Sequence, residues 1–274
     1  MSVAVHMLVR VLTCLLACCC LSAAGPALAQ PGREVLVVAN LLLPARSWPA
    51  RQAEIAGLLQ QAAVDVVLVQ QVRADDRHPP SVCSLAAPLH MQCDFVTVDP
   101  PSLPHRKGTV MLSRLPVLED GASLLHGKDD SPPVAAGYWR LQLGVQTINL
   151  YSASLSMGSG LDQRRRQQAS DLRHWMASHD PATASVVVAR FGSAHTELLQ
   201  LMPGLATTRP PRGPGQSHGL DVLYPPRRLQ LQASKLLELP PSALAPADEA
   251  ARSAPAQLLG IVVSLQLPVS AAAP

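Results

Sequence analysis

The chain has 274 residues, of which 48% are hydrophobic and only 3% aromatic, and its formal net charge at pH 7 is +3. Proteins that bind nucleic-acid phosphates usually carry a large positive charge, and this chain is nearly neutral. It also has few aromatic side chains that could stack on unpaired bases. We therefore expect no nucleic-acid partner. No flexible Gly/Ser linker divides the sequence, so we expect one domain over residues 30–274.

The first 29 residues have the composition of a signal peptide. Arg10 precedes an apolar run over residues 11–21, and the sequence Ala-Leu-Ala at 27–29 precedes Gln30. The run is shorter than the roughly 20 apolar residues that a membrane-spanning helix needs. We expect export to the bacterial periplasm or the extracellular space. The segment holds one basic and no acidic residue, so its removal lowers the net charge from +3 to +2.

The cysteines leave two questions open. Residues 15–18, Leu-Leu-Ala-Cys, also fit a lipoprotein cleavage box, which would place a lipid on Cys18 and hold the protein at a membrane. Beyond the signal peptide only Cys83 and Cys93 remain. In an oxidising compartment these two can form a disulfide. The alternative is a pair of buried free thiols.

Apolar strands alternate with amphipathic helices along the rest of the chain, the pattern of layered α/β folds. In chain order, the predicted strands are residues 35–40, 66–72, 108–112, 139–143, 147–155, 185–189, 220–223 and 259–267. The predicted helices are residues 49–62 and 163–177, where apolar side chains recur at helical spacing. Proline-rich segments between these elements are predicted to be loops, because proline lacks the backbone donor that a central strand needs.

Six short motifs occur in an order that resembles the endonuclease/exonuclease/phosphatase family. Residues 37–41, a helix and residues 65–72 are similar to its opening strands, in which an Asn and the Glu of an "LQEV" strand help bind a divalent cation. Residues 108–117 are similar to its "G-x-A-I-L-S-R-x-P-I" hairpin. Four further motifs, "NTHL", "VVxGDFN", "RIDYI" and "SDHxPVVA", have counterparts at residues 148–155, 186–193, 219–223 and 256–263. The resemblance implies a four-layer αββα sandwich of two mixed β-sheets flanked by helices.

The same resemblance implies that most of the family's catalytic residues are replaced. Asn40 and Asp221 are retained. The replaced positions are Gln71 for the metal-binding Glu, Ser154 for the His of "NTHL", Arg190 and Gly192 for the Asp and Asn of "GDFN", and Gln257 and Leu258 for the terminal Asp-His pair. Metal-assisted hydrolysis needs hard oxygen ligands and a group that activates water. The guanidinium of Arg190 would repel a metal ion at this site by about 4 kcal/mol per unit charge pair near 4 Å at an effective dielectric of 20.

We therefore expect an inactive relative of these enzymes that binds an anionic ligand or a protein partner and holds no metal or cofactor. Arg190, Asn40 and Asp221 are the expected ligand contacts. Because Asp221 lacks the histidine that it would orient in the family, we also expect it to pair with Arg190.

Two alternatives stay open. The first is a Mg²⁺- or Mn²⁺-dependent phosphodiesterase or nuclease whose ligands have moved to Asp75, Asp76 or Glu119. The second is a structural or surface protein anchored through a lipid on Cys18.

Overall fold

The computed structural model describes residues 34–43, 48–75, 80–127, 132–156, 160–191, 195–208, 219–240 and 256–268. These belong to one compact unit, Arg33–Pro274. The predicted signal peptide and Cys18 lie outside the described residues. In the part of the chain that is described, no helix is long and apolar enough to cross a membrane.

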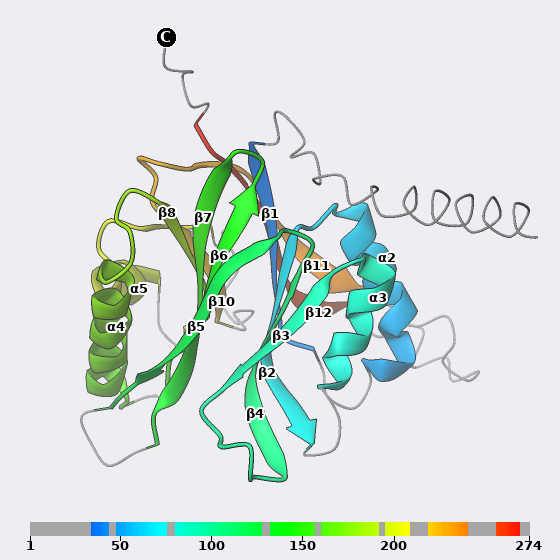
Figure 1. Ribbon diagram of the computed structural model, residues 1–274, viewed down its shortest axis with the longest axis horizontal. Helices are drawn as coiled ribbons and strands as arrows, with labels where there is room; N and C mark the ends of the chain where they lie inside the picture. Colours follow the sequence, from blue (N-terminus) through cyan, green and yellow to red (C-terminus); the bar gives the residue numbers. More distant parts are fainter. Residues whose placement is uncertain are drawn as a thin grey trace, which may run out of the picture. The chain divides into compact units, whose positions relative to one another are not determined.

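Two mixed β-sheets, each of six strands in the described residues, pack face to face (Figure 1). Sheet A has the order β11-β12-β1-β2-β4-β3, with β1 Val35–Leu41, β2 Val66–Asp75, β3 Gln92–Thr97, β4 His105–Ser113, β11 Gln230–Leu239 and β12 Gln257–Gln266. Sheet B has the order β5-β6-β7-β8-β10-β9, with β5 Val117–Leu125, β6 Val134–Leu143, β7 Gln146–Ser154, β8 Ala184–Arg190, β9 Ala206–Thr207 and β10 Leu220–Tyr224. Only β1–β2 and β7–β8 pair in parallel among the described strands.

Helices cover the outer face of each sheet (Figure 1). Sheet A carries η1 Pro49–Arg51, α2 Gln52–Gln61, η2 Ser81–Leu85 and α3 Ala86–Leu89, and sheet B carries α4 Asp162–Ala177 and α5 His195–Leu201. The predicted αββα sandwich is confirmed.

The alternation of side chains along β1 explains why its sequence is apolar throughout. Leu36 and Val38 lie in the core between the sheets, together with Leu150 and Val186 of sheet B. Ala39 and Leu41 lie in the second core, under α2. A strand that is buried on both faces has no polar face to show in the sequence.

All the predicted strands and both long helices are present, with ends that differ by several residues in β2, β4 and β6. The strands that the sequence did not predict, β3, β5, β9 and β11, are the edges of the two sheets. Most residues of β5 and β11 are exposed or half-buried, so these edges lack the continuous apolar runs of the central strands.

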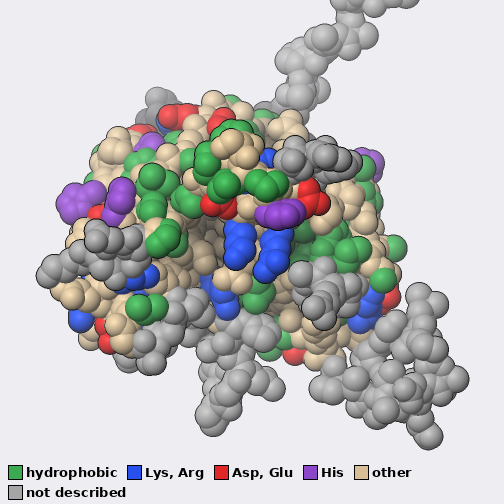
Figure 2. Space-filling view, turned by 90° about the horizontal axis from the view of Figure 1, so that it is seen from below, with side chains coloured by type: hydrophobic (Ala, Val, Ile, Leu, Met, Phe, Trp, Pro, Cys, Tyr) green, Lys and Arg blue, Asp and Glu red, His purple; other side chains and the backbone are tan. Residues whose placement is uncertain are grey.

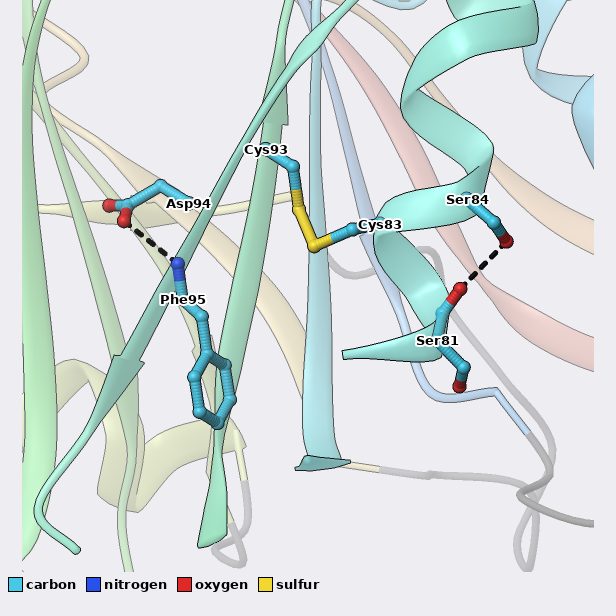
Figure 3. The surroundings of a disulfide bond; sticks show 6 residues. All are labelled: Ser81, Cys83, Ser84, Cys93, Asp94 and Phe95. Atoms are coloured by element: carbon cyan, nitrogen blue, oxygen red, sulfur yellow. Dashed lines mark hydrogen bonds between the residues drawn. A yellow bond between two sulfur atoms is a disulfide. The ribbon is translucent and has the colours of Figure 1, made fainter. Parts of the chain in front are cut away.

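A disulfide joins Cys83 in η2 to Cys93 in β3, across a Cα–Cα distance of 5.6 Å (Figure 3). Both cysteines pack against the core under α2. The bond therefore ties the η2–α3 segment to an edge strand of sheet A.

Candidate functional site

The strand ends that carry the sequence-predicted site residues meet at one end of the sandwich. Asn40 and Ser154 lie at the C-terminal ends of β1 and β7, and Arg190 is the parallel neighbour of Ser154 at the end of β8. The antiparallel strands β10 and β12 begin here, where Leu220 pairs with Arg190 and Gly260 pairs with Leu41. This convergence includes Gln71, Asp221, Gln257 and Leu258, while Gly192 lies outside the described residues.

Asn40 connects the two sheets at this point. Its side chain is fully buried, and Nδ2 donates hydrogen bonds of 2.9 Å to the carbonyl oxygens of Ala189 and Asp221 in sheet B. Its Oδ1 accepts a 3.1 Å hydrogen bond from Nε2 of Gln70, whose Oε1 accepts another from the hydroxyl of Thr109. Both N–H donors and one acceptor site of Asn40 are thus engaged in holding the sandwich together.

Gln71 lies in a β-bulge. Val69 pairs with Val110 and Val72 with Gly108, so Gln70 and Gln71 together face a single residue of β4. Gln70 is buried, whereas Gln71 is exposed and has a φ of 57°, in the left-handed region. Bulges of this kind redirect a side chain beside a functional site. Here the bulge places Gln71 on the wall of a cleft.

The cleft has a volume of about 530 Å³ and lies between the ends of β2 and β4 on one side and β6 and β7 on the other. Gln71 and Ser154, two of the sequence-predicted positions, line it. The apolar part of its lining consists of Val98, Pro133, Val134, Ala135 and Leu155. Arg190 is not among the described residues that line this cleft.

Arg73 and Lys107 also line the cleft, and the sequence analysis missed both. They are directly opposite each other on β2 and β4, and both side chains are exposed. The next pair on the same face is Asp75 and His105, with 3.4 Å between a carboxylate oxygen and Nδ1. Figure 2 shows Lys and Arg side chains near the centre of this end of the molecule, with histidine and acidic side chains beside them.

Asp99 is the carboxylate among the described cleft residues. Its Oδ2 accepts a 2.6 Å hydrogen bond from the backbone N–H of Lys107. Two cations and one carboxylate, already hydrogen-bonded, give the described cleft an excess of positive charge.

Arg190 and Asp221 lie on neighbouring strands. Arg190 is half-buried, and burial lowers the pKa of its guanidinium. Asp221 is fully buried and accepts hydrogen bonds from the Thr207 hydroxyl at 2.6 Å and the backbone N–H of Val222 at 3.0 Å. Arg190 is opposite Leu220, and Asp221 is opposite Ala189, so the register directs the two side chains to opposite faces. Their ion pair stays a prediction.

The residues at this convergence do not fit the divalent cation that the family binds. Gln71 and Ser154 carry no charge, Leu258 has no donor atom, and Arg190 adds a cation. Within the described ranges, no three His, Cys, Asp or Glu side chains lie close enough together to hold a metal ion.

Of the alternative ligands, the two that the structure describes lie in different sheets. Asp75 is next to His105 in sheet A, whereas Glu119 accepts a hydrogen bond from Tyr138 in sheet B. Asp76 lies outside the described residues.

Comparison with known proteins agrees with this architecture. The catalytic domain of human Nocturnin, solved with a bound sulfate anion, has a TM-score of 0.66 at 16% identity, over 86% of this chain and 96% of that one. A protein of the endonuclease/exonuclease/phosphatase family from Bacteroides thetaiotaomicron has a TM-score of 0.63 at 12% identity, over 86% and 96% of the two chains. TDP2 from D. rerio, in complex with a single-strand DNA product, has a TM-score of 0.60 at 10% identity, over 85% and 99%.

These identities show a shared fold. No curated protein matches the sequence significantly. The model of the Endonuclease/Exonuclease/phosphatase family matches residues 37–189, more than half of the sequence. The chain belongs to the endonuclease/exonuclease/phosphatase family.

Proposed function

We propose that this chain is an exported, non-catalytic member of its family, whose cleft binds an anionic small molecule. The observation that carries the proposal is the pair Arg73 and Lys107, directly opposite each other on the wall of the cleft. The positions that would hold a cation and activate water in a hydrolase are occupied by Gln71, Arg190 and Leu258.

The loss of catalysis follows from the sum of these replacements. An amide oxygen can still bind a metal ion, so Gln71 alone would weaken a site without removing it. The retained Asn40 already uses both N–H groups and one acceptor site in bonds within the fold. Arg190 stands at the position of the water-activating Asp, and a guanidinium cannot accept a proton from water.

The cleft favours a small molecule over a protein surface. Its volume of about 530 Å³ lies within the usual range of small-molecule sites. The cations Arg73 and Lys107 and the apolar lining residues suit a ligand that has both an anionic group and an apolar organic part.

Calorimetric titration with Mn²⁺ separates this proposal from a hydrolase with displaced ligands. We expect no saturable heat, and the same trace from Asp221→Ala. A stoichiometric site with micromolar to millimolar affinity would contradict the proposal.

Binding of inorganic phosphate tests the second half of the proposal. We expect a saturable heat in the wild type that is lost in Ser154→Trp, because the indole would fill the cleft. Val145→Trp is the matched control, since Val145 is 81% exposed in the turn at the other end of β7. Thermal unfolding of both variants would show whether the loss reflects binding or folding.

Mass spectrometry of the mature N-terminus tests export. We expect a chain that begins at Gln30. A chain that begins at Cys18 with attached lipid would support the anchored alternative.

A further inference from the structure

We infer that Arg73 and Lys107 bind the terminal phosphate of a small phosphomonoester, and that they select this dianion over a phosphodiester. The inference rests on the proposed function, because it names the ligand class of the same cleft. It places the anion on the β2–β4 pair and not at Arg190, the contact expected from the sequence.

Arg73 and Lys107 repel each other when no anion is bound between them. Residues directly opposite on antiparallel strands have Cβ atoms about 4.5–5.5 Å apart, and like charges at such positions are destabilising. In the described part of the chain, neither Arg73 nor Lys107 is within salt-bridge distance of a carboxylate. One phosphate can accept hydrogen bonds from the guanidinium fork and the ammonium together and neutralise both.

The positive surface that Arg73 and Lys107 form is small. Asp75 is two residues from Arg73 on the same face of β2, and Asp99 is held against the backbone of Lys107. These carboxylates border the two cations, so they would repel the neighbouring phosphates of a polyanion. The arrangement admits one compact anion.

The charge of a phosphomonoester matches that of the two cations more closely than the charge of a diester does. A phosphomonoester carries about −1.5 to −2 at neutral pH, whereas a diester carries about −1. The two cations together carry +2. The apolar lining residues and the side chains of Ser154 and Ser156 lie in the same cleft, where they can contact the organic part of the ligand.

Calorimetry of the full chain with methyl phosphate and dimethyl phosphate tests this selection. At a pH of about 8 and fixed ionic strength, we expect methyl phosphate to bind at least about tenfold more tightly, because each added charge-assisted hydrogen bond contributes appreciably. Arg73→Gln and Lys107→Gln should each weaken methyl phosphate binding by about tenfold or more. Arg227→Gln, which removes an exposed cation in the turn before β11, is the matched control and should bind as the wild type does.

Thermal unfolding without ligand separates a lost site from a lost fold. Because the two cations repel each other, Arg73→Gln and Lys107→Gln should unfold at the same temperature as the wild type or slightly higher. Equal affinity for the two esters, or wild-type binding by both Gln variants, would overturn the inference. If phosphate still binds in that case and Ser154→Trp abolishes it, the proposed function stands. If neither ester nor phosphate binds, both fail.

Discussion

The Nδ2 atom of Asn40 at the end of β1 donates a 2.9 Å hydrogen bond to the main-chain oxygen of Asp221 at the start of β10. These are the two polar residues that the family's catalytic pattern and this chain share, and both are fully buried. Their contact joins sheet A to sheet B. The fold therefore explains the retention of Asn40, whereas the bond to Asp221 uses a main-chain oxygen that does not depend on its side chain.

Replacement of Asn40 tests this structural role. Asn40→Ala removes three buried hydrogen bonds, so we expect the free energy of unfolding to fall by about 3 kcal/mol in urea denaturation. Asn40→Asp should cost more, because a carboxylate would face two carbonyl oxygens. Gln232→Ala is the control: the Gln232 amide, exposed on the edge strand β11, donates a hydrogen bond to the Gln266 side chain, and its loss should stay within about 0.5 kcal/mol. A similar, small effect at both sites would argue against the bridge.

The bulge makes a separate prediction about Gln71. A residue other than glycine in the left-handed region costs about 1–2 kcal/mol of stability. Glycine avoids this cost, but it loses more conformational entropy on folding, which offsets part of the gain. Gln71→Gly should therefore raise the free energy of unfolding by up to about 1 kcal/mol, whereas the β-branched Gln71→Val should lower it. Urea denaturation of both variants measures the difference. The opposite order would show that Gln71 is not held at positive φ.

The bulge also shows where prediction from the sequence ends. Central strands such as β1 and β8 were predictable because they are buried on both faces, and the order of motifs correctly predicted the family and its sandwich fold. The edge strands were not, since most of their residues are exposed or half-buried and form no continuous apolar run. The opposition of Arg73 and Lys107 depends on the register after the bulge, which two distant strands determine together.

The disulfide between Cys83 and Cys93 should contribute to stability through the unfolded chain. Closing a loop with a sequence separation of 10 restricts the unfolded state by about 3 kcal/mol. We expect Cys83→Ser/Cys93→Ser to unfold at correspondingly lower urea concentration. Dithiothreitol should destabilise the wild type and leave the double variant unchanged. Equal stability of the oxidised wild type and the double variant would show that the bond adds nothing.

Two buried tyrosines predict a loss of stability at high pH. Tyr138 and Tyr151 have ring centroids 5.1 Å apart, and burial raises the pKa of both phenols above the usual value of 10. The folded state then keeps protons that the unfolded chain releases, so stability is full below pH 10 and falls as pH rises from there toward the folded pKa. Urea denaturation at increasing pH should show a shallower fall in Tyr151→Phe. An identical fall would contradict this assignment.

The central claim is that the metal and water-activating groups are gone from an intact scaffold. Hydrolysis of bis(p-nitrophenyl) phosphate in the presence of Mg²⁺ or Mn²⁺ tests it most directly, with the wild type and Asp221→Ala prepared side by side. We predict that both proteins release p-nitrophenol no faster than buffer with the same metal. A metal-dependent rate in the wild type that disappears in Asp221→Ala would contradict the account.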